Sequence, residues 1–101
     1  MKKIVLIFAL GLLSLGAVES EKLYKHCVVC HGKQGELVAI KSSPKLASLG
    51  QVELSARLKK VLDGSTSLSQ NYLAMHQVKM KNLTPQETDA FAKYITELGQ
   101  K

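Results

Sequence analysis

The pattern of apolar and polar residues predicts an all-α chain with three main helices. The first expected helix begins at Ser20, whose hydroxyl can cap it, and runs toward Cys30. In the second, apolar residues recur at helical spacing between 52 and 62, and Gly64 follows where a glycine commonly ends a helix. No alternating pattern of useful length predicts a strand, so long loops are expected between the helices.

The last expected helix has the clearest boundaries. Residues 84–87, Thr-Pro-Gln-Glu, form a capping box with proline at the first helical position, and Gly99 lies at the other end. Its apolar residues share one face: Phe91, Tyr94, Ile95 and Leu98. The preceding segment, residues 65–82, is polar and ambiguous, with only a helical turn or two expected from residue 72 to residue 81. Loops of this length in a small domain need something to order them.

Residues 1–18 have the pattern of a secretory signal peptide. Two lysines precede a run of 15 residues of which 12 are hydrophobic, and cleavage is expected near residues 17–20. The run is shorter than the roughly 20 residues that span a bilayer as a helix. We therefore expect export to the periplasm of a bacterium and a soluble domain over residues 19–101. An uncleaved membrane anchor is the alternative.

Beyond the signal segment, the composition indicates a single small domain with a thin core. The chain has 101 residues and a formal net charge of +6, and from residue 19 on only 33 of 83 residues are hydrophobic. Disulfides, metals or cofactors usually help to fill such an interior. The same part carries 12 basic and 8 acidic residues. This surface fits an acidic protein partner better than nucleic acid, because the chain has a single arginine.

The two cysteines of the chain, Cys27 and Cys30, are followed directly by His31. This C-x-x-C-H spacing is typical of covalent haem attachment, in which each thiol adds to a haem vinyl group and the imidazole binds the iron. A redox-active cysteine pair is one alternative, although it usually follows a strand and opens a helix. A zinc site would need further ligands, for which His26 and His76 make a poor set. A structural disulfide closing so short a ring would stabilise little.

The segment around this motif resembles the haem-binding segment of small bacterial class I c-type cytochromes. Residues 23–35 contain an apolar–aromatic pair, two further residues and then C-x-x-C-H-G-x-x-G. Residues 83–95 resemble the last helix of that family, with a capped start and an A-x-Y-I ending. The resemblance implies a class I cytochrome c fold, in which helices and long loops surround one covalently bound haem c. It also implies that the first and last helices cross near Tyr24, Phe91 and Tyr94.

The resemblance further implies that a methionine from the C-terminal half binds the sixth position of the iron. Met75 lies eight residues before Leu83, whereas Met80 lies only three residues before it and close to the cap of the last helix. We therefore expect Met75 to reach the iron from a loop, with Met80 as the second choice and otherwise as core filler. His76 in place of Met75 would give a bis-histidine haem of lower potential.

The loop after the motif contains two further residues that the resemblance assigns to the haem surroundings. In this family, the carbonyl of a proline accepts a hydrogen bond from the ligating histidine and so fixes its tautomer. Residues 43–46, Ser-Pro-Lys-Leu, match that place. Pro44 is the expected acceptor, and Leu46 is expected to pack against the haem.

A six-coordinate iron has no open position for a substrate, so the expected function is electron transfer. We predict a periplasmic monohaem c-type cytochrome that carries single electrons between respiratory redox proteins, docking through an acidic surface of the partner. No enzyme activity, small-molecule substrate or nucleic-acid partner is expected, because the sequence shows no nucleophile–base pair and no phosphate loop. The alternatives are a thiol–disulfide oxidoreductase that uses Cys27 and Cys30, and a haem sensor with an open sixth position.

Overall fold

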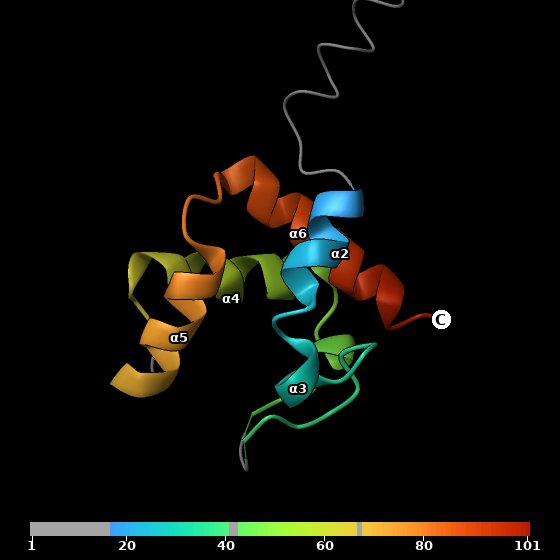
Figure 1. The fold of residues 1–101 in the computed structure, drawn as a ribbon, viewed down its shortest axis with the longest axis horizontal. Coiled ribbons are helices and arrows are strands. Elements are labelled where there is room, and N and C mark those ends of the chain that lie inside the picture. Colours follow the sequence, from blue (N-terminus) through green and yellow to red (C-terminus); the bar gives the residue numbers. More distant parts are fainter. Residues whose placement is uncertain (1–16, 41–42, 67) are drawn as a thin grey trace, which may run out of the picture.

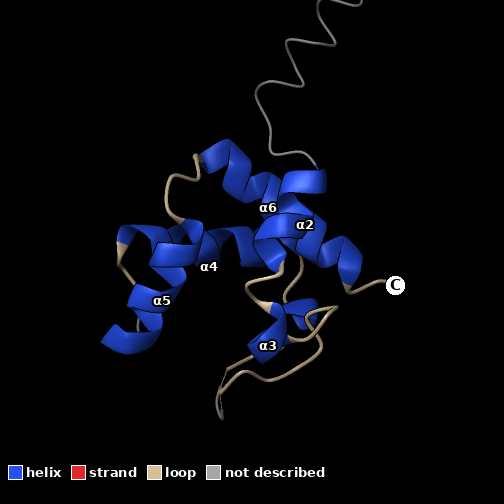
Figure 2. Cartoon of the chain, in the orientation of Figure 1, coloured by secondary structure: helices blue, strands red, loops and turns tan. Residues whose placement is uncertain are grey.

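The computed structural model describes residues 17–40, 43–66 and 68–101. Helices and connecting loops make up this part of the chain, and no strand occurs within the three ranges (Figure 2). The prediction of an all-α fold is confirmed. The predicted signal peptide, residues 1–18, lies almost entirely outside the described residues. Within the described ranges, no helix is both long and apolar enough to cross a membrane.

Five α-helices and one short 3-10 helix follow one another along the described residues. They are α2 (Ala17–Tyr24), α3 (Val28–His31), η1 (Leu46–Ser48), α4 (Gln51–Asp63), α5 (Gln70–Met80) and α6 (Pro85–Leu98). Figure 1 shows α2 crossing α6, with α4 running alongside this pair and α5 packed on α4. In this view α3 and α5 both lie below α4. The predicted crossing of the first and last helices is confirmed.

The predicted first helix from Ser20 to Cys30 is wrong in two respects. The described part of α2 begins at Ala17, so Ser20 lies inside the helix with a buried side chain and does not cap it. The helix also breaks before the cysteines. The amides of His26 and Cys27 bond to carbonyls three residues earlier, which tightens the last turn and lets α3 start in a new direction.

The segment before α6 is more helical than its sequence predicts. α5 spans 11 residues, so Met75 lies on a helix. The sequence predicts it on a loop, and that prediction is wrong. A tertiary contact accounts for part of this difference. The side-chain amide of Gln77 donates to the carbonyl oxygen of Val61 in the last turn of α4, at 2.9 Å. The contact adds a second donor to a carbonyl that also accepts from the Gly64 amide, and it holds α5 against α4.

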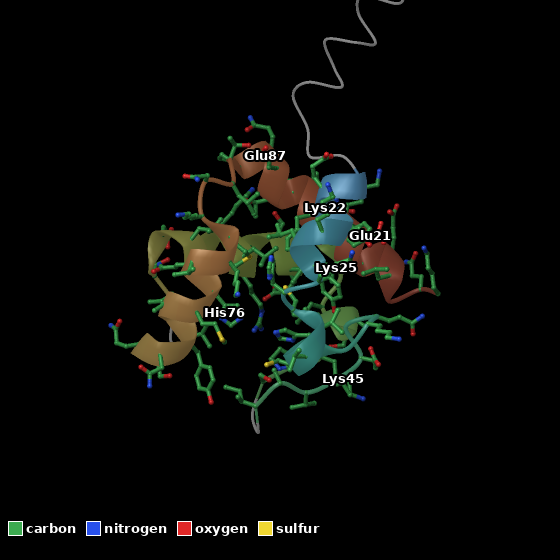
Figure 3. All side chains as sticks on the ribbon, viewed as in Figure 1. Glu21, Lys22, Lys25, Lys45, His76 and Glu87 are labelled. Atoms are coloured by element: carbon green, nitrogen blue, oxygen red, sulfur yellow. The ribbon has the colours of Figure 1, made fainter. Side chains whose placement is uncertain are left out.

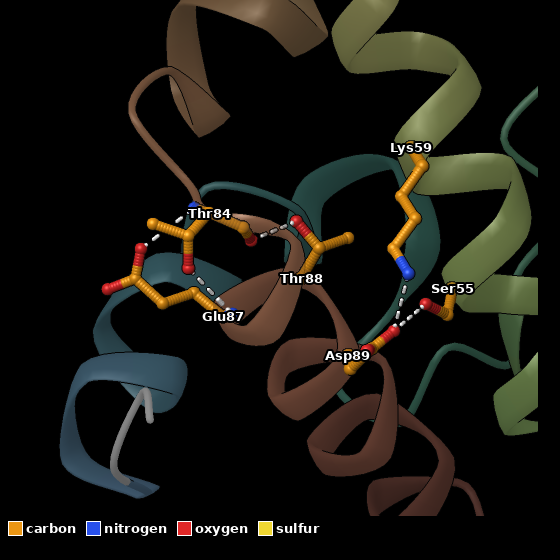
Figure 4. A network of polar contacts seen from close by, with 6 residues as sticks. All are labelled: Ser55, Lys59, Thr84, Glu87, Thr88 and Asp89. Carbon is orange, nitrogen blue, oxygen red and sulfur yellow. Dashed lines mark hydrogen bonds and ion pairs between the residues drawn. The ribbon is translucent and has the colours of Figure 1, made fainter. Parts of the chain in front are cut away.

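The predicted ends of α4 and α6 are confirmed. Gly64 follows α4 in the left-handed conformation, with φ of 83°. At the start of α6, the Thr84 hydroxyl oxygen accepts from the Glu87 amide at 3.1 Å, and the Thr84 amide donates to the Glu87 carboxylate at 2.9 Å (Figure 4). This reciprocal pair of bonds is the capping box that the sequence predicts.

Polar side chains also join α4 to α6. The Asp89 carboxylate accepts a hydrogen bond from the Ser55 hydroxyl and lies 2.9 Å from the Lys59 ammonium (Figure 4). Both bonds hold the pKa of the Asp89 carboxyl below its usual value. Because Lys59 and Asp89 are about half exposed, water screens the pair and it stabilises the fold little.

The hydrophobic core lies where α2, α4 and α6 meet. Its buried members are Tyr24, Leu54, Val61, Met80, Phe91, Ala92 and Ile95. The rings of Tyr24 and Phe91 pack at the α2–α6 crossing, with centroids 6.5 Å apart and planes tilted by 58°. Tyr94 and Leu98 pack against this cluster and are partly buried. The core is small, as the composition predicts.

Candidate functional site

One helical turn carries the three residues of the C-x-x-C-H motif. Cys27 directly precedes α3, and Cys30 and His31 end it. The His31 amide donates to the Cys27 carbonyl at 2.9 Å, which closes the turn. Both cysteines are free thiols, Cys27 half-buried and Cys30 exposed. Between them, Val28 packs against the core, whereas Val29 is 89% exposed. The two thiols and the imidazole are therefore presented together by α3 and the residue that caps it.

The Cys27 thiol is protonated at neutral pH. Burial, followed by the neighbouring Cys30, raises its pKa to about 11. A redox-active C-x-x-C pair needs a thiolate, and its attacking cysteine has a lowered pKa. The environment of Cys27 therefore disfavours a thiol–disulfide oxidoreductase.

His31 has the environment of a neutral imidazole. Burial, and in addition the charge of His76, lowers its pKa, and an imidazole binds a metal only when it is unprotonated at the ligating nitrogen. Its Nδ1 atom is buried and has no hydrogen-bond partner among the described residues. A hydrogen bond to the Pro44 carbonyl is thus not formed in this structure, where Pro44 is exposed. The role of Pro44 toward a haem stays a prediction.

The loop after the motif returns to it at η1. The Ala47 amide donates to the Gly35 carbonyl at 2.9 Å, and a Cβ atom at Gly35 would lie only 3.0 Å from the Cβ of Leu46. Glycine is needed there because its φ is 68° and the backbone of η1 is so close. Leu46 is thereby held beside the motif segment and against the core, and its contact with a haem stays a prediction.

α5 places His76 opposite the motif. The ring centroids of His31 and His76 are 6.3 Å apart, with planes inclined by 66°. Figure 3 shows His76 on the side of α5 that faces α3. The Nδ1 atom of His76 lies 2.6 Å from the Tyr72 carbonyl oxygen. Met75, next to His76, is 43% exposed, whereas Met80 is 3% exposed and belongs to the core. Of the two candidate methionines, only Met75 is free of the core.

A family comparison identifies this arrangement. The model of the cytochrome c family matches residues 17–99, which include the motif, α5 and α6. The chain belongs to the cytochrome c family. Members of this family bind haem c covalently and transfer electrons, generally as carriers and not as enzymes. Neither the search of curated proteins nor the search of solved structures finds a match.

The residues of this cytochrome c fit a covalently bound haem. The two free thiols lie one turn apart, and the buried, unpartnered Nδ1 of His31 leaves that ring free to adopt the tautomer that a metal ligand requires. Cys27 and Cys30 are the residues that would form the thioethers, and His31 is the residue that would bind the iron. Such a group would supply a redox centre that gains and loses one electron.

Tyr24 is a positioning residue whose role the sequence did not reveal. Its hydroxyl donates to the carbonyl oxygen of Gly32, directly after the motif, at 2.6 Å. Burial is the main reason that the pKa of Tyr24 rises to about 12. Gly32 itself has φ of 86°, and a Cβ atom there would collide with the Glu36 carboxylate. The bond ties the motif segment to the α2–α6 crossing.

We expect Tyr24→Phe to destabilise the haem-containing protein by about 0.5–1.5 kcal/mol, because the buried Gly32 carbonyl loses its shorter hydrogen bond and keeps only the 3.3 Å bond from the Gly35 amide. Urea unfolding measures this change. Tyr72→Phe is the matched control, since the Tyr72 side chain is 41% exposed, and we expect a change within about 0.5 kcal/mol. Equal midpoints for the two variants would mean that the Tyr24 hydroxyl contributes no stability.

Proposed function

We propose that this cytochrome c is a periplasmic carrier of single electrons between redox proteins. In this proposal Cys27 and Cys30 attach one haem c, His31 binds the iron, and Met75 fills the sixth position. The observation that carries it is the half-buried imidazole of His31, whose pKa is lowered by burial, within the same helical turn as two free thiols. The exposed side chain of Met75 on α5 supports the choice of this methionine, because Met80 is packed in the core.

With Met75 in the sixth position, the haem would act in a carrier and not in a sensor or an enzyme. A protein ligand on each side of the iron leaves no place for a substrate or a gas to bind. The remaining residues of the site then act by holding these ligands in place. Tyr24 fixes the end of α3 through Gly32, and the contact of η1 with Gly35 fixes the following loop.

The charge around the motif supports an acidic docking surface on the partner. Lys25 precedes α3, Lys33 follows the motif and Lys45 directly precedes η1, and all three are exposed. Figure 3 labels Lys25 and Lys45. Exposed lysines attract an acidic protein over about one Debye length, and salt screens this attraction. The signal-peptide pattern of residues 1–18 supports export to the periplasm.

The test is electron transfer by protein expressed from the full chain in a bacterium that attaches haem c. We expect a haem-staining band in the periplasmic fraction and a single one-electron step on redox titration. In the ferrous form, we expect the protein to resist carbon monoxide, because Met75 holds the sixth position. Rapid binding of carbon monoxide would instead support a sensor, and recovery in the cytoplasmic fraction would contradict export.

The docking surface is tested by stopped-flow electron exchange with an acidic redox protein. We expect the rate to fall with ionic strength and to fall further in Lys25→Gln/Lys33→Gln, with Lys93→Gln on α6 as the control. A rate that salt does not change would contradict electrostatic docking while leaving the carrier function intact.

A further inference from the structure

We propose that His76 is a reserve ligand for the sixth position, which its imidazole takes when the Met75 thioether is absent or dissociates. The proposal rests on the proposed function, since it requires haem on the C-x-x-C-H motif. In this exchange the iron–sulfur bond to Met75 breaks and an iron–nitrogen bond to His76 forms. No proton or electron is gained or lost, because both ligands are neutral.

The spacing of the two histidine rings supports the proposal. Bonds between imidazole nitrogen and a metal are about 2.0–2.1 Å long, so two imidazoles on opposite sides of one ion have centroids roughly 6 Å apart. The centroids of His31 and His76 are 6.3 Å apart. The 66° angle between the planes is compatible with this arrangement, because each ring can turn about its own metal–nitrogen bond. In this structure α5 therefore holds His76 at a suitable distance from His31.

The hydrogen bond of His76 leaves the correct nitrogen free. Nδ1 lies 2.6 Å from the Tyr72 carbonyl oxygen, which can only accept, so Nδ1 carries the proton. In the neutral ring, Nε2 is then the unprotonated atom that can bind a metal. A metal-binding histidine commonly donates its other ring N–H to a carbonyl in this way, which fixes the tautomer and the orientation of the ring.

The position of Met75 makes the two ligands mutually exclusive. Consecutive residues of an α-helix point about 100° apart, since 3.6 residues complete a turn, so Met75 and His76 cannot both face His31. His76 faces His31 in this structure, so binding of the iron by Met75 requires α5 to turn about its axis. The Met75 side chain is 43% exposed and therefore free to move away. Met80 is no competitor on α5, because its removal from the core would open a cavity. Loss of Met75 thus leaves His76 as the candidate on α5.

The test is the ligand state of full-length, haem-loaded Met75→Ala. We expect the weak near-infrared methionine–ferric band to disappear while the iron stays six-coordinate and low-spin, with a lower midpoint potential than wild type. In Met75→Ala/His76→Ala we expect a five-coordinate, high-spin iron. Met75→Ala should bind carbon monoxide at least roughly tenfold more weakly than the double variant, because the gas binds only molecules whose sixth position is open.

Three controls make the result specific. His76→Ala alone should keep the methionine band, and Met75→Ala/His26→Ala should stay low-spin, which excludes the histidine at the turn before α3. Met80→Ala should also keep the band. Should Met75→Ala accumulate poorly, Met75→Leu preserves the side-chain volume and serves for the same measurements.

A high-spin Met75→Ala that binds carbon monoxide as tightly as the double variant would overturn the proposal. So would a wild-type protein that gains the methionine band only on His76→Ala, since His76 would then be the resident ligand. Neither result contradicts the proposed carrier, which fails only if wild-type protein contains no covalent haem or does not transfer electrons.

Discussion

Cys27→Ser/Cys30→Ser is expected to be recovered without covalent haem and largely unfolded. Serine cannot form the two thioethers. His31 would then be the one remaining attachment on the motif, and it lies on a helix of only four residues. Among the described residues the core has only seven buried hydrophobic side chains, and the motif segment touches it mainly through partly buried side chains. Small domains with so little buried apolar surface depend on a further stabilising element, here the attached group.

Mass spectrometry, haem staining and far-ultraviolet circular dichroism of the exported protein measure this loss. Val29→Ser is the matched control, because it places a serine between the same two cysteines at a position that is 89% exposed. We expect the control to keep both the haem and its helical signal. A cysteine-free variant that retains the mass of the prosthetic group would refute covalent attachment through this pair.

Phe91→Ala is expected to cost about 3–5 kcal/mol, the usual range for removal of a buried phenylalanine. Phe91 is 1% exposed and packs its ring 6.5 Å from that of Tyr24, so the variant leaves a cavity where α2 crosses α6. Domains of this size are stable by only about 5–15 kcal/mol in total, so this loss is a large fraction.

Denaturant unfolding of the haem-containing protein measures the effect of Phe91→Ala. Val52→Ala on α4 is the control, since Val52 is 86% exposed and its change is expected to stay within about 0.5 kcal/mol. Similar unfolding midpoints for the two variants would mean that the α2–α6 crossing does not hold the fold together.

Helix ends were predictable where local side chains determine them. The Thr84–Glu87 capping box and Gly64 act within three or four residues, so their sequence pattern is enough to place the ends of α6 and α4. The course of α5 was not predictable in the same way. Its polar sequence gives no clear apolar stripe, and the bond from Gln77 to Val61 joins residues that are far apart in the chain.

The same distinction holds for the site. The three residues of the motif are adjacent in sequence, so their spacing alone indicates their chemistry. His31 and His76 are 45 residues apart, and their proximity depends on how α5 packs on α4. The hydroxyl bond of Tyr24 is likewise invisible in the sequence, which indicates only that an aromatic residue lies near the crossing.

The unequal burial of the two valines within the motif has a consequence for how the reduction potential can vary. Val28 is needed for packing, but Val29 points into water one residue before Cys30. A charged side chain at position 29 would lie within one helical turn of His31, the proposed iron ligand, and would favour one oxidation state over the other through its field. Selection could thus adjust the electrochemistry of the protein at a residue on which the fold does not depend.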